Sequence, residues 1–161
     1  MKSRRFGVAW LFALAPATLQ GQGVGPVVVE WGLHATATAV DSLRVGIAAG
    51  PRLALRSLGG TRLALSFGLG VLKDSLNARA EAAVEYQVSP RRAGRAGVYF
   101  GGGLAGVVGA GRGGYLLLLV GLENNPGLPG GWAIEAGLGG GFRVRAAYHW
   151  RRFPRGWRPE R

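Results

Sequence analysis

The chain contains no cysteine, a single methionine and only two histidines among its 161 residues. The missing cysteine excludes a disulfide framework, a thiolate metal site and a cysteine nucleophile. Acidic residues are also few, eight against 20 lysines and arginines, so the formal net charge is +12. One apolar run, residues 6–15, is about half the length of roughly 20 residues that a membrane-spanning helix needs.

Glycine, in contrast, is abundant, with 30 residues against a usual share of about 7%. The glycines follow no G-X-Y period, which excludes a collagen-like chain. Glycine weakens a strand, but it permits the bends and close approaches of a curved sheet that closes on itself. The length allows one domain with a single core or a single small barrel.

Residues 1–21 have the layout of a secretory signal peptide. A basic start precedes the apolar run, and the Ala-Pro-Ala sequence at 15–17 offers a cleavage site, with 19–21 as a second candidate. Loss of this segment removes three cationic residues and lowers the net charge from +12 to +9. We expect an exported protein, with an uncleaved anchor as the alternative. Export argues against nucleic acid as a partner of the basic chain.

The segment 142–151 shows the clearest period of two. Its alternate positions read Phe, Val, Ala, Tyr, Trp on one face and Arg, Arg, Ala, His, Arg on the other. Because successive side chains of a strand point to opposite faces, this strand would have one apolar face and one cationic face. Apolar-out and polar-in alternation, with aromatic residues near the ends, is typical of a transmembrane β-barrel.

Similar short runs, separated by turn residues, predict eight strands. They cover residues 26–38, 43–57, 61–71, 76–88, 96–108, 115–123, 132–138 and 142–151. The fourth run would also suit a helix, the fifth has no clear alternation, and the sixth is apolar on both faces. Short turns favour an antiparallel up-and-down meander, and eight such strands can close into a barrel with a filled interior.

We therefore predict an all-β chain with three parts. A signal peptide (1–21) precedes an eight-stranded transmembrane β-barrel domain (22–153), and a basic tail (154–161) follows it. The tail either lies on anionic lipid headgroups, through its arginines and tryptophan, or forms a disordered solubilising end.

The non-apolar faces of the strands carry many charged residues. On a lipid-facing surface each arginine would cost about 2–4 kcal/mol near the bilayer midplane, so we expect these side chains to point inward and form ion pairs. The predicted lumenal charge network is Glu30, Arg44, Arg52, Arg56, Arg79, Glu81, Glu85, Glu135, Arg143 and Arg145, with Arg62 on the same faces. The predicted membrane-interface aromatic residues are Trp31, Tyr86, Trp132, Phe142, Tyr148, Trp150 and Phe153.

With a signal peptide, eight strands, an Arg/Glu interior and an aromatic last strand, the chain resembles the small OmpA-like and OmpX-like outer-membrane barrels. The pattern Tyr148-x-Trp150-x-x-Phe153 is similar to the aromatic signal by which barrel-insertion machinery recognises their last strand. The resemblance implies a Gram-negative outer membrane, contact with its lipids and lipopolysaccharide, and a monomer. Two features depart from the family: residues 154–161 follow the last aromatic residue, and the predicted outer loops are no longer than the inner turns.

The sequence offers no catalytic, cofactor-binding or metal-binding set, and we predict none. In the meander, His34 and His149 should lie far apart along the barrel axis, which argues against a metal pair or an acid–base pair. Some eight-stranded barrels modify lipid A with a His-x-Ser motif, but His34-Ala35-Thr36 has threonine in the serine position.

The favoured hypothesis is a non-enzymatic outer-membrane barrel, structural or surface-presenting, whose lumen is filled by arginine and glutamate. One alternative is a soluble secreted barrel of lipocalin type that binds a small apolar ligand, with the apolar faces inside. The second alternative is a lipid A-modifying barrel enzyme.

Overall fold

The computed structural model describes residues 27–41 and 44–160, and the expected signal peptide lies outside these ranges. The described residues form eight strands, whose bounds differ from the predicted ones by at most three residues. They are β1 (Val27–Asp41), β2 (Arg44–Ser57), β3 (Thr61–Leu72), β4 (Ser75–Gln87), β5 (Ala96–Gly109), β6 (Gly113–Asn124), β7 (Gly130–Leu138) and β8 (Phe142–Arg152). The described part of the chain holds no helix with the length and apolar character to cross a bilayer.

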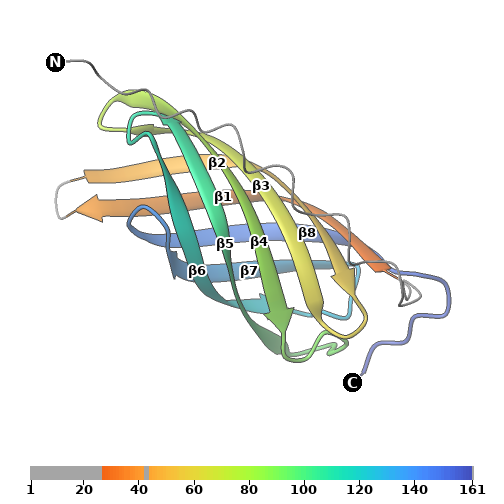
Figure 1. The fold of residues 1–161 in the computed structure, drawn as a ribbon. Coiled ribbons are helices and arrows are strands. Elements are labelled where there is room, and N and C mark those ends of the chain that lie inside the picture. The colour runs from red at the N-terminus through yellow and green to blue at the C-terminus, as the bar shows by residue number, and fades with distance from the viewer. Residues whose placement is uncertain (1–26, 42–43, 161) are drawn as a thin grey trace, which may run out of the picture.

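The strands form one closed antiparallel barrel in chain order (Figure 1). Each strand pairs with the next, and β8 returns to pair with β1, where Trp150 lies opposite Trp31 and Ala146 opposite Ala35. The predicted eight-stranded up-and-down barrel is therefore confirmed. Closure gives every strand two hydrogen-bonded neighbours and leaves no open sheet edge.

The barrel has two ends with different connections (Figure 1). At the tail end, the β2–β3, β4–β5 and β6–β7 turns lie beside the last described residues, 153–160. The opposite end, which we call the mouth, carries the β3–β4, β5–β6 and β7–β8 turns. The β3–β4 turn is a two-residue hairpin in which Lys73 and Asp74 have φ of 50° and 60°. Positive φ at both positions is the type I′ geometry that matches the twist of the flanking strands.

The three ambiguous runs are all strands. In β4, buried and exposed residues alternate from Arg79 to Gln87, so the helical alternative is wrong. In β6, four consecutive leucines alternate between the two faces, with Leu117 and Leu119 buried and Leu116 and Leu118 exposed. Because all four residues are leucine, the sequence alone does not show this alternation.

Glycines at inward positions of β5 and β6 allow a side chain or the backbone of a neighbouring strand to approach closely. A Cβ at Gly121 would lie 2.2 Å from Cζ of Tyr99, and one at Gly101 would lie 2.4 Å from the carbonyl oxygen of Val84. Both contacts are shorter than atoms allow, so these positions require glycine if the wall and the Tyr99 ring are to stay in place.

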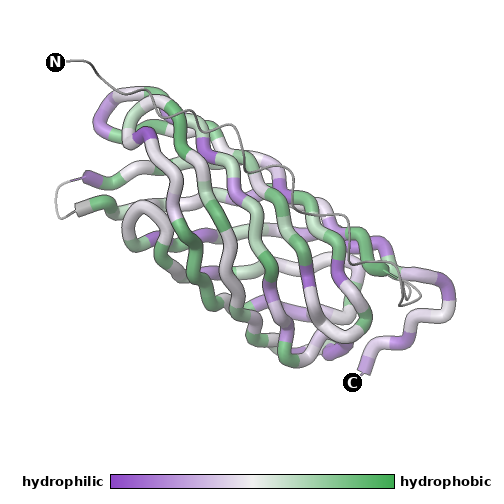
Figure 2. Tube along the Cα trace, in the orientation of Figure 1, coloured by the Kyte–Doolittle hydropathy of each residue, from purple (hydrophilic) through white to green (hydrophobic). Residues whose placement is uncertain are grey.

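The barrel wall carries apolar side chains outside and charged side chains inside. Leu76 and Leu116 are 82% and 79% exposed, whereas Arg56, Arg62 and Arg143 are 0% exposed. Figure 2 shows the corresponding alternation of hydrophobic and hydrophilic residues along the strands. This distribution is the reverse of the one expected for a domain whose outer surface meets water.

Candidate functional site

The lumen of the barrel is the part of the described chain with the greatest concentration of buried charge. Seven arginines and five glutamates are each at most 9% exposed. They are Arg52, Arg56, Arg62, Arg79, Arg143, Arg145 and Arg151, with Glu30, Glu81, Glu85, Glu123 and Glu135. Strand periodicity places them there, because each occupies an inward position of its strand.

Arg62, on β3, is the centre of the network near the tail end. Its Nε lies 2.7 Å from Oε2 of Glu85, on the neighbouring strand β4. One terminal nitrogen lies 2.7 Å from Oε2 of Glu123 on β6 and 3.2 Å from Oε2 of Glu30 on β1. Arg62 thus joins three strands across the lumen, and charge-assisted bonds of this kind are about twice as strong as neutral ones.

Two further arginines connect this cluster to the turns at the tail end. Arg56 donates to the carbonyl oxygen of Pro126 at 2.8 Å and to Oε1 of Gln87 at 2.5 Å. Arg151 donates to Oε1 of Glu123 at 2.5 Å and to the carbonyl oxygen of Leu128 at 3.0 Å. The β6–β7 turn is therefore held to the lumen by side chains of β2 and β8.

A second cluster lies nearer the mouth and is centred on Glu81. Its Oε1 accepts from Nε of Arg79 and from a terminal nitrogen of Arg143, both at 2.5 Å, and Arg145 donates to Oε2. Arg143 also donates to Glu135. One carboxylate therefore neutralises parts of three guanidinium groups from β4 and β8.

Arg52 connects the two clusters. Its terminal nitrogens lie 2.5 Å from Oε1 of Glu85 and 3.8 Å from Oε2 of Glu135. The result is one continuous chain of ion pairs along the lumen, from the β6–β7 turn to Glu81. Such a network is stable only while its members stay paired, because an isolated buried charge is strongly unfavourable.

One side of the lumen is apolar rather than charged. Ala83, Tyr99, Leu119 and Ala133, from β4 to β7, form a buried cluster. The guanidinium carbon of Arg62 lies 4.7 Å from the centre of the Tyr99 ring, a cation–π distance. The Tyr99 hydroxyl lies 3.3 Å from Oε2 of Glu135. The aromatic ring thus fits between the two ionic clusters and fills space that a purely ionic lumen would leave to water.

Two small cavities lie along the lumen. A cavity of about 10 Å³ lies beside His34, Thr36 and Arg145, roughly the smallest volume that holds one water molecule. At the mouth, a cavity of about 60 Å³ is lined by residues that include Tyr115, Arg79 and Leu72. The described interior is therefore filled mainly by side chains.

Most residues of the predicted lumenal network lie in the lumen, with one exception. Arg44 belongs to the set of alternate β2 residues that face the lumen, but its side chain is exposed. The reason is that Arg44 is the first residue of the strand and lies at the rim of the mouth. Two members of the observed network were missed. Glu123 ends the leucine-rich strand β6, and Arg151 is on the predicted cationic face of the last strand but not in the predicted network. Counting by two from Leu119 or from Arg145 would have placed both of them inside.

The two histidines are closer than predicted. His34 lies opposite Ala147 and Gly32 lies opposite His149, so the histidines occupy neighbouring strands with an offset of two residues. The expected separation along the axis is wrong because the register between β1 and β8 brings His149 to within two residues of the level of His34. Both side chains are buried. The described residues contain no group of three or more His, Asp, Cys or Glu positioned to hold a metal ion.

Six of the seven predicted interface aromatic residues lie on the outer surface. Trp31 and Trp150 stack with ring centres 4.4 Å apart, and Tyr148 packs edge-on against Trp150 at 4.9 Å. Trp132 lies opposite Tyr148, while Tyr86, on the other side of the barrel, packs against Phe100 at 5.7 Å. The sixth, Phe142, lies at the mouth and is 54% exposed.

Phe153 is placed differently from the prediction. Its ring stacks on Trp157 with centres 4.6 Å apart, and the Arg56 guanidinium lies 5.8 Å from its centre. The alternation of β8 explains this position. Phe153 follows Arg151 by two residues, so its side chain continues the inward face of the strand. It covers the tail end of the charge network instead of joining the outer aromatic residues.

No family model matches the chain, and a search of curated proteins finds no match. The functional conclusion therefore depends on the geometry of the barrel itself. That geometry is a closed wall, apolar outside, around a lumen filled by one continuous ionic network.

Proposed function

We propose that this chain is an integral outer-membrane β-barrel protein without enzymatic activity. Its role is structural or surface-presenting, and its lumen is filled rather than open to diffusion. The observation that carries the proposal is the inverted burial of the wall: among the described residues, twelve charged side chains are buried in the lumen, and large apolar side chains are exposed at outward positions of every strand.

The outer surface favours hydrocarbon over water. Soluble monomers rarely expose a continuous apolar patch larger than a few hundred Å². Here exposed leucines, valines and isoleucines occupy the outward positions of all eight strands, from Leu33 of β1 to Val144 of β8. Contact with acyl chains removes this surface from water without any partner protein.

The strand lengths also fit a bilayer. The strands contain 9 to 15 residues, and a tilted transmembrane strand needs about 9–11. A closed barrel satisfies the backbone hydrogen bonds of every strand within the wall, which a spanning sheet requires because hydrocarbon offers no partners.

The ionic network supports a filled lumen. For a solute to pass, the bonds from Arg62 to Glu30, Glu85 and Glu123 would have to break, and each separated charge would stay buried. The lipocalin-type alternative would place an apolar ligand in the lumen, and the charged lining disfavours such a ligand. The lipid A-modifying alternative would need its site to reach the outer surface, whereas His34 and Thr36 are 6% and 3% exposed and point inward.

The test is fractionation of cells that express the full chain, combined with gel mobility before and after heating. We expect the protein in the outer-membrane fraction, with a mobility shift on heating that reports an unfolded barrel. A soluble periplasmic product without a shift would overturn the proposal in favour of a secreted ligand-binding barrel. Planar-bilayer recording tests the filled lumen, since a steady open conductance would contradict it.

A further inference from the structure

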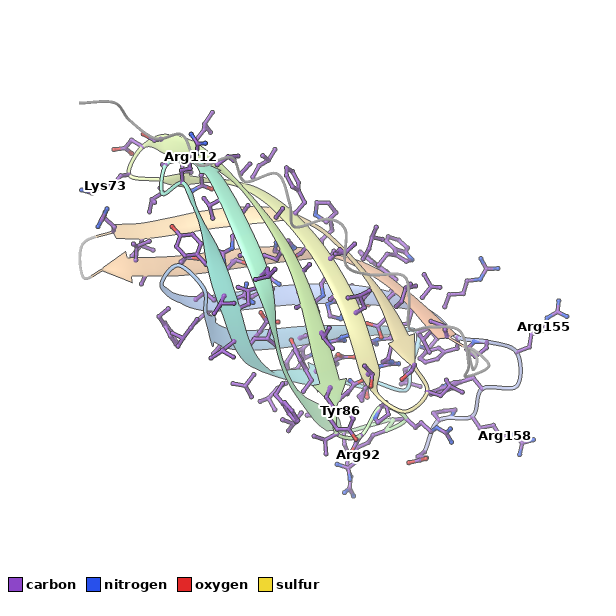
Figure 3. All side chains as sticks on the ribbon, viewed as in Figure 1. Lys73, Tyr86, Arg92, Arg112, Arg155 and Arg158 are labelled. Atoms are coloured by element: carbon purple, nitrogen blue, oxygen red, sulfur yellow. The ribbon has the colours of Figure 1, made fainter. Side chains whose placement is uncertain are left out.

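The two ends of the barrel differ strongly in exposed charge. At the tail end, the exposed charged residues within the described ranges are six arginines and one glutamate: Arg91, Arg92, Arg95, Arg152, Arg155, Arg158 and Glu160. At the mouth, among the described residues, Arg44, Lys73 and Arg112 accompany Asp74. Figure 3 shows Arg92, Arg155 and Arg158 at one end of the barrel and Lys73 and Arg112 at the other.

The tail is built into this end of the barrel. The amide of Ala93 donates to the carbonyl oxygen of Glu160, and the amide of Glu160 donates to that of Arg91, both at 2.8 Å. These bonds form a short parallel bridge between the tail and the β4–β5 loop. The indole of Trp157 donates to the carbonyl oxygen of Gly127 at 3.0 Å. The tail therefore presents its arginines from a fixed backbone.

The tail and the loops border an open hollow of about 290 Å³. Three exposed arginines, Arg91, Arg155 and Arg158, line it. A terminal nitrogen of Arg91 lies 3.9 Å from Oε1 of Glu160, which is outside this lining, and the Arg91 guanidinium carbon lies 5.7 Å from the centre of the Trp157 ring. The rest of the lining is Leu58, Pro154, Gly156 and Trp157. Cations beside apolar side chains suit a ligand that has an anionic group attached to an apolar body, rather than a free inorganic anion.

Outward-facing aromatic residues lie on the tail-end half of the barrel wall, on more than one side of it. Those on the tail-end half of their strands are Trp31, Tyr86, Phe100, Trp132, Tyr148 and Trp150. Aromatic rings of this kind prefer the headgroup level of a bilayer. An arginine group directly beyond such a band would lie among lipid phosphates, where each basic residue gains free energy from the negative surface.

We propose that the hollow at the tail end binds the headgroup of an anionic phospholipid, with its phosphate against Arg91, Arg155 and Arg158. This inference rests on the proposed membrane location. The topology selects the leaflet. Because the number of strands is even, the first residue of β1 and the last residue of β8 lie at the same end of the barrel. A polar tail stays on the side from which the barrel is inserted. In an outer membrane that is the inner, phospholipid leaflet, which excludes lipopolysaccharide from this hollow.

The test uses the full mature chain in detergent micelles, titrated with phosphatidylglycerol or phosphatidylcholine, with bound lipid counted by native mass spectrometry. We expect preferential binding of phosphatidylglycerol. The double variant Arg155→Gln/Arg158→Gln should weaken it by about five-fold per arginine removed. The matched control, Lys73→Gln/Arg112→Gln, removes the same charge at the mouth and should leave the affinity unchanged. Millimolar inorganic phosphate should not displace the lipid.

The inference would be overturned by equal binding of the two lipids, by equal losses in the two double variants, or by displacement by inorganic phosphate. Tighter binding of lipid A than of phosphatidylglycerol at the same arginines would assign the hollow to the other leaflet and overturn it as well. Heat-modifiable mobility and insertion into vesicles are measured in parallel for each variant. An inserted barrel without lipid preference contradicts only this inference, whereas a barrel that never inserts contradicts the proposed function too.

Discussion

The tail end and the mouth are closed in different ways although one wall forms both. At the tail end, Arg56 and Arg151 hold the β6–β7 turn through its carbonyl oxygens, and Phe153 covers Arg56. At the mouth, Arg79 donates to the carbonyl oxygen of Gly139 at 2.7 Å. A cavity of about 60 Å³ lies there, beside Tyr115. The comparison indicates that buried arginines hold the described turns of the tail end through more bonds than those of the mouth.

The largest expected effect concerns the centre of the tail-end network. Arg62→Met leaves Glu30, Glu85 and Glu123 without their shared cation, and breaking a buried ion pair from one side costs about 3–5 kcal/mol. Urea unfolding of the folded barrel in vesicles, followed by gel mobility, measures the change. Arg112→Met at the mouth is the control and should stay within about 0.5 kcal/mol. Similar losses of unfolding free energy in the two variants would show that burial of Arg62 in the network adds no more stability than an exposed arginine does.

The second effect tests the outer wall between the two ends. Leu65 points outward near the middle of β3, opposite Leu53, and is 53% exposed. In a bilayer, Leu65→Arg should cost about 2–4 kcal/mol, whereas Leu76→Arg, one residue into β4 at the mouth, should cost about 0–1 kcal/mol. The same urea titration in vesicles measures both. Two equal and negligible costs would mean that the wall meets water at both depths, which contradicts the membrane proposal.

The sequence was sufficient for the wall and for most of the network. Period-two alternation placed Arg52, Arg56 and Glu81 on the inward face because each lies on a strand with clear contrast between its faces. Glu123 was missed because the leucines before it are identical on both faces of β6. The position predicted for Phe153 is wrong because it follows the resemblance to an aromatic end signal, whereas the alternation of β8 directs this side chain inward. The partners of Arg62 come from three strands, and such contacts depend on barrel register, which a single strand does not encode.

The third effect concerns the tail. Ending the chain after Phe153 removes two backbone hydrogen bonds, the Trp157 indole bond and an aromatic stack. Each of these contacts is worth about 0.5–1.5 kcal/mol, and water bonds to the freed groups offset part of the loss. We therefore expect the free energy of unfolding to fall by about 1–3 kcal/mol. Trp157→Ala should give a smaller loss in the same direction, and Arg155→Gln/Arg158→Gln none. An unchanged stability after truncation would mean that the ionic network alone seals the tail end.

The smallest expected effect tests the mouth itself. The Tyr115 hydroxyl donates to the carbonyl oxygen of Gly111 at 2.9 Å, at an exposed position of the β5–β6 connection. Water can replace this bond, so Tyr115→Phe should lower stability by less than about 1 kcal/mol. Hydrogen exchange of the Gly113 and Gly114 amides measures local opening and should increase without global unfolding. If Tyr115→Phe instead lowered the free energy of unfolding as much as Arg62→Met, the mouth would contribute as much stability as the tail-end network. The two ends would then differ only in their exposed charge.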